Sequence, residues 1–268
     1  MIEPIKLEVV QEDDFNGIEL HNDLIIKASD QIGEQPLAIS YGVKFGKHVP
    51  IVTYGNFMCI SGSAKVGKSW LKKILIAGYL GGKTGQYFSE IRSFNNQNKY
   101  VIDIDTEQSD YHVHRGACTV RDMVGSESMY YRSFALRSLS PSQRVRFLEW
   151  IFNESDYKGK IGICLIDGVA DLVSDINNYE QATDCSRRLL KLTKEHHCAM
   201  ITVIHTRYDS NKATGHIGSE VSKKAETIIK MEKNDDTYNA IPLLTRNMPL
   251  DEFSFIIKDG IPQQDINF

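Results

Sequence analysis

The pattern of apolar and polar residues along the chain changes near residue 50. From Asn56 onward, short apolar runs alternate with longer amphipathic stretches, which is typical of a mostly parallel sheet flanked by helices. The runs predicted to be buried strands are Phe57–Ser61, Tyr100–Ile104, Met129–Phe134, Ile161–Ile166 and Ala199–Ile204. Further strands are expected at Thr227–Met231, Ala240–Leu244 and Phe253–Ile257, with a turn at Asp259-Gly260. The sequence therefore predicts an α/β domain over residues 51–268 that ends in antiparallel strands.

Helices are expected between these runs. Ser140 can cap a helix over Pro141–Asn153, because Pro141 fits the first helical position and Gln143 completes a capping box. Apolar residues from Tyr179 to Leu192 recur at helical spacing and predict a second helix. The polar stretch Tyr208–Ser219 contains two glycines and predicts a flexible loop, with a short helix near Glu220–Thr227 after it.

The first fifty residues differ in composition from the rest. They are rich in Asp, Glu, Asn and Gln, with short apolar patches at Leu24–Ile26 and Leu37–Ile39, and we interpret residues 1–50 as an appended segment with two short strands. Met1–Leu20 is acidic and lacks the basic and apolar regions of a secretory signal. No apolar run approaches the roughly 20 residues that span a bilayer. We therefore expect a cytoplasmic protein without a membrane partner.

The charge balance limits how the chain can bind nucleic acid. The 31 basic and 35 acidic residues give a net charge of -4. This balance supplies no broad basic field for non-specific DNA binding, so DNA would need a local patch or the pore of an oligomer. The five cysteines show no C-x-x-C spacing and are interpreted as small buried residues rather than metal ligands.

The strongest local motif is Gly62-Ser63-Ala64-Lys65-Val66-Gly67-Lys68-Ser69, a complete G-x-x-x-x-G-K-S between a predicted strand and a predicted helix. Its glycines allow backbone N–H groups to point at phosphate oxygens, Lys68 would neutralise the β and γ phosphates, and the Ser69 hydroxyl would ligate Mg²⁺. Lys65 is extra to the motif and is alternatively an exposed loop lysine. The residues expected to hold the nucleotide are Gly62, Ser63, Ala64, Lys65, Val66, Gly67, Lys68, Ser69 and Trp70.

Acidic residues at strand ends would complete the site. Asp167 ends the run Ile161–Ile166 and is expected to hold Mg²⁺; the alternative is a residue that only starts a turn. Glu107 follows the run Tyr100–Ile104 and would polarise the attacking water; the alternative is a charge that favours the dipole of a helix over Asp110–Met123. If the chain stays extended, Asp103, Asp105 and Glu107 share one side.

Two further expectations concern the neighbouring strands. Because Tyr100–Ile104 lies between the P-loop and Asp167 in the sequence, we expect this strand to lie between those two strands in the sheet. His205 ends the run Ala199–Ile204, where it would reach the γ-phosphate and report its loss to the following loop. The alternative is a histidine with a structural role.

These motifs, in this order, resemble the RecA-like ATPases. More narrowly, they resemble the RepA-type branch of ring-forming plasmid replicative helicases and the AAA-family mobilisation ATPases of bacterial mobile genetic elements. The resemblance covers residues 50–260. It rests on Gly55-Asn56-Phe57 before the P-loop, Asp105–Ser109 with His112 and Arg115, Ile166–Leu172, Ile204-His205-Thr206, and Gly215–Glu220 with Lys224-Ala225-Glu226.

The resemblance implies a RecA-like ATPase domain that forms a homo-oligomer, a hexameric ring with ATP between subunits, and works with replication or mobilisation proteins of the element. It implies a basic finger from the neighbouring subunit, for which Lys223, Lys224 and Arg246 are candidates; Thr214 stands where relatives often carry Arg. It also implies a loop that touches single-stranded DNA in the pore, for which the candidates are Arg207, Lys212 and His216. An ordinary surface loop is the alternative.

Two functions follow from these motifs. The first is an ATP-binding and hydrolysing motor that acts on DNA in replication or mobilisation of a mobile genetic element, with Lys68, Glu107, Asp167 and His205 as catalytic residues and ATP and Mg²⁺ as cofactors. The alternative is a slow ATP-dependent assembly switch or scaffold without helicase activity. A small-molecule kinase is disfavoured because the order of the acidic strands does not suit it.

Overall fold

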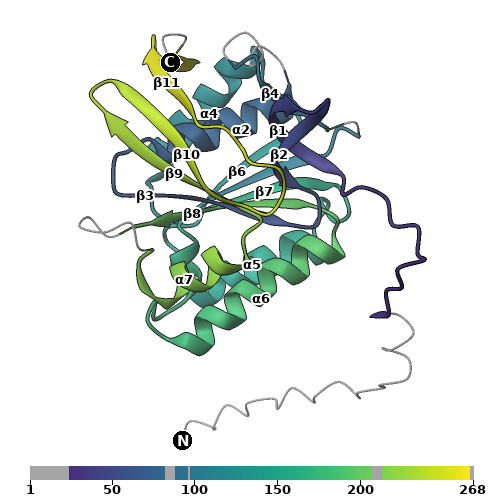
Figure 1. The fold of residues 1–268 in the computed structure, drawn as a ribbon. Coiled ribbons are helices and arrows are strands. Elements are labelled where there is room, and N and C mark those ends of the chain that lie inside the picture. The colour runs from purple at the N-terminus through teal and green to yellow at the C-terminus, as the bar shows by residue number, and fades with distance from the viewer. Residues whose placement is uncertain (1–23, 82–87, 96, 207–212, 266–268) are drawn as a thin grey trace, which may run out of the picture. The chain divides into compact units, whose positions relative to one another are not determined.

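The computed structural model describes residues 24–81, 88–95, 97–206 and 213–265 (Figure 1). The chain divides into two units, Met1–Glu34 and Gln35–Phe268. In the first unit, the described residues 24–34 are all exposed, including the apolar patch at Leu24–Ile26. The second unit contains the sheets and helices.

The second unit is built on a nine-stranded sheet in the order β12-β11-β10-β9-β3-β8-β7-β5-β6. The strands from β9 to β6 in this order are parallel, and β10, β11 and β12 continue the sheet as antiparallel strands. Their bounds are β3 Phe57–Gly62, β5 Tyr100–Asp105, β6 Tyr131–Ala135, β7 Ile161–Asp167, β8 Ala199–His205, β9 Thr227–Asn234, β10 Thr237–Thr245, β11 Phe253–Lys258 and β12 Ile261–Gln264. The predicted α/β class, with a mostly parallel sheet and C-terminal antiparallel strands, is confirmed.

Helices cover both faces of this sheet (Figure 1). One face carries α2 (Lys68–Leu80) and α4 (Asp110–Val124); the other carries α5 (Pro141–Asn153), α6 (Tyr179–Glu195) and α7 (Gly215–Lys224), with the short 3₁₀ helix η1 (Val169–Leu172). Along β3, Met58 and Ile60 enter the core on the α2 side, whereas Phe57 and Cys59 enter the core on the other side. The central strand is therefore buried on both faces, which explains its continuous apolar sequence.

Helix α5 begins as its sequence predicts. The Ser140 hydroxyl accepts a hydrogen bond from the Gln143 N–H at 3.3 Å, and the Gln143 side chain accepts one from the Ser140 N–H at 2.9 Å. Pro141 occupies the first turn. The capping box therefore satisfies two N–H groups that the helix itself leaves unpaired.

The strand order corrects one expectation. The strand between the P-loop strand β3 and the Asp167 strand β7 is β8, which carries His205; β5, which leads to Glu107, lies beyond β7. The chain runs from β3 out to β6 through α2 and α4 on one face, then returns to β7, β8 and β9 through α5, α6 and α7 on the other face. Because the chain changes faces when it changes direction, all crossover connections can have the same handedness. Strands β7 and β8, formed on the way back, then lie between β5 and β3.

A second, three-stranded sheet has the order β2-β1-β4, with β1 Leu37–Lys44, β2 Lys47–Thr53 and β4 Ile91–Ser93. Ala38 and Ile39 of β1 and Val49 and Ile51 of β2 are buried in the core on the α2 side. The compact unit accordingly begins at Gln35, so residues 35–50 belong to it rather than to the segment 1–50 expected from the sequence. Burial of these apolar residues draws the two strands into the core.

The segment after β8 also differs from expectation. Helix α7 begins at Gly215, inside the predicted loop Tyr208–Ser219, and ends at Lys224. A Cβ on Gly218 would lie 2.8 Å from Ala213 Cβ and 3.3 Å from Ile204 Cγ2. This glycine permits close packing of the helix, whereas its sequence context suggested flexibility. Residues 207–212 of the predicted loop lie outside the described residues.

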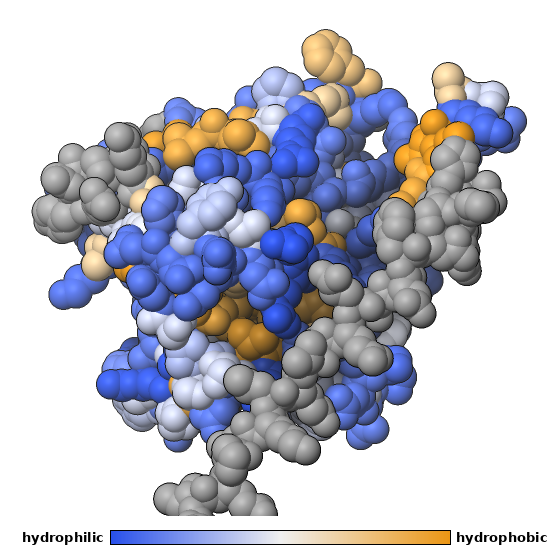
Figure 2. All heavy atoms as spheres, turned by 90° about the horizontal axis from the view of Figure 1, so that it is seen from below, coloured by the Kyte–Doolittle hydropathy of each residue, from blue (hydrophilic) through white to orange (hydrophobic). Residues whose placement is uncertain are grey.

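The face that carries α5, α6 and α7 is mostly hydrophilic, with hydrophobic residues visible between the hydrophilic ones (Figure 2). Among the helices that the structure describes, none combines the length and the apolar character needed to cross a membrane. The buried residues of the unit lie between the sheet and its helices.

Candidate functional site

The P-loop connects β3 to α2 in a backbone shape that requires glycine at both ends. Gly62 has φ +153° and Gly67 has φ +96°. A Cβ on Gly62 would lie 2.8 Å from the Met231 carbonyl, and one on Gly67 would lie 2.4 Å from the Tyr238 ring. The loop is therefore packed against β9 and β10. Gly67 has no side chain to cap α2. The Trp70 and Leu71 N–H groups donate to the Gly67 carbonyl, which leaves the N–H groups of Lys68 and Ser69 for another acceptor such as an anion.

Strand ends bring the predicted residues to one edge of the sheet. The register pairs Gly62 of β3 with His205 of β8, and Asp105 of β5 with Asp167 of β7. These are the carboxyl ends of parallel strands, where α/β folds place their ligand sites. Lys68, at the start of α2, lies at the same edge.

Lys68 is buried and holds the P-loop. Its Nζ donates to the Gly62 carbonyl at 2.9 Å and to the Ser63 carbonyl at 2.5 Å, and it lies 3.3 Å from His205 Nδ1. Burial lowers the pKa of Lys68, against the opposing attraction of Asp167 and Glu107. The ammonium is thus held by two neutral carbonyls and an imidazole, partners that a phosphate could replace.

His205 connects Lys68 to Glu107. Because an ammonium can only donate, Nδ1 of His205 accepts from Lys68, and the imidazole proton lies on Nε2. Nε2 then donates to Glu107 Oε1 at 3.1 Å. The His205 and Glu107 side chains are each 42% exposed, so this end of the chain of contacts faces solvent. The structure brings together Lys68, His205 and Glu107 from three separate elements.

A tight turn directs Glu107 away from the strand that precedes it. Asp105 Oδ1 accepts from the N–H groups of Glu107 at 3.0 Å and Gln108 at 2.7 Å. Thr106 Oγ1 donates to the Asp167 carbonyl at 2.9 Å, which ties this turn to the end of β7. Strand β5 ends at Asp105, so alternation places Asp103 and Asp105 on one side, while Glu107 follows the turn toward His205.

A buried lysine that the sequence analysis did not identify lies behind this edge. Lys72 Nζ is 2.9 Å from Asp167 Oδ2, 3.1 Å from Asp103 Oδ1 and 3.9 Å from Asp105 Oδ2. All four residues are buried. Burial alone lowers the pKa of Lys72, but the charges of Asp103, Asp167 and Asp105 outweigh this effect and raise it overall. The available signal was a lysine one helical turn after Lys68 on the apolar side of α2, between Leu71 and Ile74.

The donors expected for Mg²⁺ lie next to this cluster. Ser69 lines a small cavity of about 20 Å³ together with Lys72, Asp103 and Asp105. A hydroxyl and carboxylates are the oxygen donors that Mg²⁺ prefers, so the donor set of Ser69 and Asp167 fits this ion. Among the described residues, no three His, Cys, Asp or Glu side chains are arranged to hold a metal ion by themselves.

The rest of the predicted nucleotide-binding segment is more accessible. Ala64 and Lys65 are exposed, and Trp70 is partly buried beneath the ammonium of Lys73, which lies 4.1 Å from the centre of its ring. Burial and the neighbouring charge of Lys72 lower the pKa of Lys73 to about 8. At pH values between about 8 and 10.5, Lys73 is therefore protonated to a smaller extent than an exposed lysine.

Two of the three candidates for the finger, Lys224 and Arg246, lie near the opposite edge of the sheet. Arg246 Nη2 donates to the Lys224 carbonyl at 3.2 Å, while the Lys224 ammonium donates to Ser186 Oγ at 2.7 Å. Lys223 pairs with Glu220 at 2.7 Å. The Glu226 N–H, two residues after Lys224, donates to the carbonyl of Phe57, which starts β3. The length of β3, roughly 17 Å at about 3.3 Å per residue, separates Lys224 and Arg246 from their own P-loop. Lys223 instead lines a cavity together with Ser61, near the end of β3, and Thr206.

The DNA-loop candidates are only partly described. Arg207 and Lys212 lie outside the described residues. His216 is exposed in the first turn of α7, with its ring edge-on to Tyr179 at 6.0 Å between centres. An antiparallel bridge between Thr206 and Ala213 brings together the two ends of the segment 207–212.

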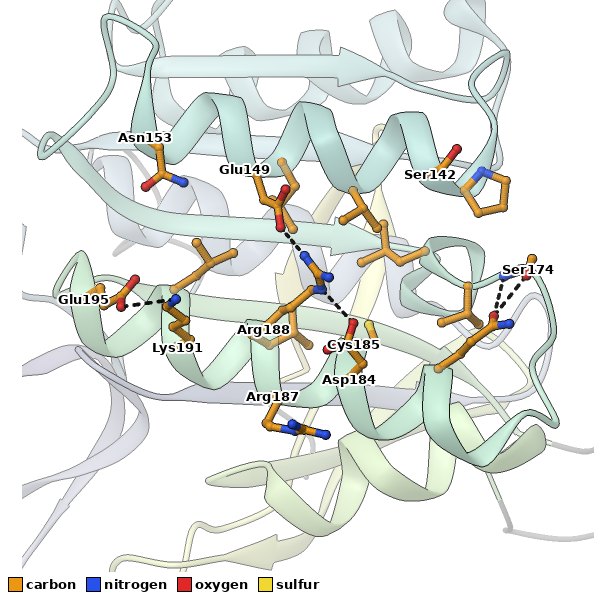
Figure 3. Close-up of a pocket in the computed structure, with 18 of the residues that line it drawn as sticks. Ser142, Glu149, Asn153, Ser174, Asp184, Cys185, Arg187, Arg188, Lys191 and Glu195 are labelled. Carbon is orange, nitrogen blue, oxygen red and sulfur yellow. Dashed lines mark hydrogen bonds and ion pairs between the residues drawn. The ribbon is translucent and has the colours of Figure 1, made fainter. Parts of the chain in front are cut away.

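A groove of about 880 Å³ lies between α5 and α6 (Figure 3). Its apolar lining includes Leu148, Leu172 and Leu189. Arg188 bridges it, contacting both Glu149 and Asp184 (Figure 3). No predicted nucleotide-site residue lines this groove. The basic residues Arg188 and Lys191 of α6 form ion pairs within the chain.

Comparison with known proteins does not assign this chain to a family. No protein-family model matches it, and no curated protein matches it.

Proposed function

We propose that this chain is a RecA-like, RepA-type ATPase that hydrolyses ATP in a hexameric ring and acts on DNA during replication or mobilisation of a mobile genetic element. The observation that carries the proposal is the contact chain from Lys68 through His205 to Glu107 at the carboxyl edge of the sheet. A strand between β3 and β7 is also the arrangement expected of motor-type P-loop ATPases. The RecA-like assignment rests on these features together with the motifs.

Nucleotide binding follows from the chemistry of the P-loop. The N–H groups at the start of α2 and the ammonium of Lys68 would contact the β and γ phosphates. Lys68 then exchanges its contact with His205 for phosphate oxygens, and His205 Nδ1 becomes free to accept a new proton. Ser69 and Asp167 would hold Mg²⁺, which when bound neutralises charge on the phosphates.

Hydrolysis would use Glu107 as the general base. Glu107 orients a water and accepts its proton as the water oxygen attacks the γ-phosphorus, and the bond to the β-phosphate oxygen breaks to give ADP and phosphate. His205 contacts both Lys68 and Glu107, so it is positioned to couple phosphate occupancy to the base. Loss of the γ-phosphate would restore the contact between Lys68 and His205, and this change is passed to the segment after β8.

The location of the basic candidates supports a ring. Arg246 and Lys224 lie at the edge opposite to their own P-loop, so they would complete the site of a neighbouring subunit. An arginine supplied in this way contributes about 10³–10⁵ in turnover. Ring assembly would also bring six copies of Arg207, Lys212 and His216 around DNA, despite the net charge of -4.

The same location favours the second candidate function, an assembly switch with slow turnover. The finger candidates are held by contacts within the chain, so hydrolysis would wait for assembly. Sedimentation with ATP and with ADP separates the two functions. A motor forms rings and turns over ATP faster with single-stranded DNA, whereas a switch assembles with ATP but is not stimulated.

A matched pair of lysines in one loop tests the proposal. Lys68→Ala removes the buried ammonium, and we expect it to abolish binding of a fluorescent ATP analogue and all turnover. Lys65→Ala removes only an exposed ammonium and keeps the backbone N–H through which this loop residue would contact phosphate, so both should stay within about threefold of wild type. Equal binding by Lys68→Ala and wild type would contradict nucleotide binding at this loop.

A further inference from the structure

The buried ammonium of Lys72 occupies the centre of three carboxylates. Asp167, Asp103 and Asp105 each direct an oxygen toward Nζ, at 2.9, 3.1 and 3.9 Å. The Lys72 side chain is only 5% exposed. Buried charges are retained only when they are paired, so the position of this lysine and the ionisation of the aspartates depend on each other.

The Asp103 and Asp105 carboxylates are also held by hydrogen bonds within the protein. Asp103 Oδ2 accepts from the Tyr131 hydroxyl at 2.8 Å. Asp105 Oδ1 accepts the two N–H groups of the turn that carries Glu107, and its Oδ2 accepts from the Gln108 side chain at 2.7 Å. The aspartates of β5 and β7 therefore have fixed positions around a single cation, the Lys72 ammonium on α2.

Charge counting shows what this cation does. Three carboxylates and one ammonium leave the cluster with a net formal charge of -2. Without the ammonium, three buried carboxylates would lie close together with a formal charge of -3, and this charge would attract a divalent cation to Asp167 more strongly. The Lys72 ammonium lies within ion-pair distance of all three carboxylates and supplies one positive charge there without a metal.

We infer that Lys72 is a positioning residue that lowers the negative charge around Asp167, and so makes Mg²⁺ binding at Asp167 depend on nucleotide. This inference rests on the proposed function, which assigns Asp167 as a ligand of Mg²⁺. Lys72 cancels one of the three negative charges and holds Asp167 Oδ2, so Mg²⁺ gains enough negative charge only when phosphates are added beside Ser69. The empty protein then stays free of metal.

The neighbouring residue provides a matched control. Lys73 has the same side chain and lies next to Lys72 on α2, but its ammonium covers the ring of Trp70 at 4.1 Å. Replacing Lys73 removes one positive charge near the site without opening the centre of the carboxylate cluster. A general electrostatic effect would appear in both variants, whereas the proposed role belongs to Lys72 alone.

The test is Mn²⁺ binding to the nucleotide-free full chain, measured by calorimetry and by the spin-resonance signal of free Mn²⁺. For Lys72→Met we expect affinity at least about tenfold above wild type, and for Lys73→Met a change within about threefold. Lys72→Gln, which keeps a polar group but no charge, should also bind Mn²⁺ more tightly if Lys72→Met fails to fold. Wild-type affinity in the folded Lys72 variant would overturn the inference.

Two further arms separate this inference from the proposed function. The double variant Lys72→Met/Asp103→Asn loses one charge of each sign, and we expect it to bind Mn²⁺ within about threefold of wild type. Tight binding by the double variant would contradict the charge argument. Failure of wild type to bind a fluorescent ATP analogue would contradict the proposed function, whereas the Mn²⁺ affinities of nucleotide-free protein test Lys72 alone.

Discussion

The two edges of the parallel sheet use their charges differently. At the carboxyl edge, Lys68 is held by two carbonyls and an imidazole, and Glu107 and His205 remain partly exposed. At the amino edge, Glu226 is buried and accepts from the Thr53 N–H and hydroxyl at 2.9 and 2.8 Å and from the Asn247 side chain at 2.6 Å. The first edge offers partners that a ligand can replace, whereas the second joins β2 to the segments that follow α7 and β10.

The difference implies that substitutions at the two edges should change different measurable properties of the protein. Carboxyl-edge variants should alter binding and turnover of a folded protein. At the amino edge, Glu226 should affect stability, and the finger candidates Lys224 and Arg246 should affect only the site of a neighbouring subunit.

The largest effect is expected from Arg246→Ala. If Arg246 is the finger, turnover of the assembled protein should fall about 10³-fold or more, with nucleotide binding retained. Because the lost group acts on a neighbour, mixing this variant with Lys68→Ala should restore part of the activity, since some mixed interfaces pair an intact P-loop with an intact Arg246. Mixtures that stay as inactive as the separate variants would argue against action between subunits.

A smaller loss is expected from His205→Ala at the carboxyl edge. Removing the imidazole breaks the link between Lys68 and Glu107 but leaves the P-loop backbone intact. Turnover should fall about 10²-fold, at the low end of general acid–base effects, while the affinity for an ATP analogue changes less than about threefold. A purely structural histidine would instead lower the melting temperature and leave turnover per folded protein unchanged.

Glu226→Ala should act on stability. The substitution leaves the buried Thr53 N–H without its carboxylate acceptor, and we expect the free energy of unfolding to fall by about 3 kcal/mol. Urea denaturation measures this loss. Nucleotide affinity of the folded fraction should match wild type, and a large drop in affinity at unchanged stability would break the distinction between the two edges.

Lys73→Met should give the smallest effect, and one that depends on pH. The pKa of Lys73 is lowered from 10.5 to about 8 in the folded protein, so at pH 7 the folded state holds a proton at a cost that the unfolded state does not bear. This cost is lost as the pH rises from 8 to 10.5, where only the unfolded state still binds the proton.

The variant should therefore be more stable than wild type by about 2 kcal/mol at pH 7, after allowance for partial exposure. This advantage should shrink toward pH 10.5 in urea denaturation experiments. An advantage that stays constant with pH would show that the lysine is charged equally in both states.

Local sequence signals predicted much of the fold. The strands over Phe57–Gly62 and Ile161–Asp167 and the capped helix α5 follow from apolar run length and from residue types that satisfy the ends of a helix. The P-loop shape follows likewise from its glycines. These features depend on residues that are neighbours in the sequence.

Features that depend on distant contacts could not be predicted in this way. The position of β8 beside β3 depends on where the chain reverses after β6, which no local pattern indicates. In the sequence, Lys72 cannot be distinguished from other helical lysines, because the three aspartates around it come from β5 and β7, which are distant in the chain. The start of α7 was missed because Gly218 suggested a loop, whereas in the fold it packs against Ala213 and Ile204.

The central proposal is that residues at the carboxyl edge of the sheet hydrolyse ATP and that this hydrolysis drives an action on DNA. The most direct measurement is steady-state ATP turnover with and without single-stranded DNA at two salt concentrations, in wild type and in Glu107→Gln. The proposed mechanism predicts stimulation by DNA that weakens at the higher salt, and a loss of about 10²-fold or more in the variant. Turnover that neither responds to DNA nor changes in Glu107→Gln would contradict it.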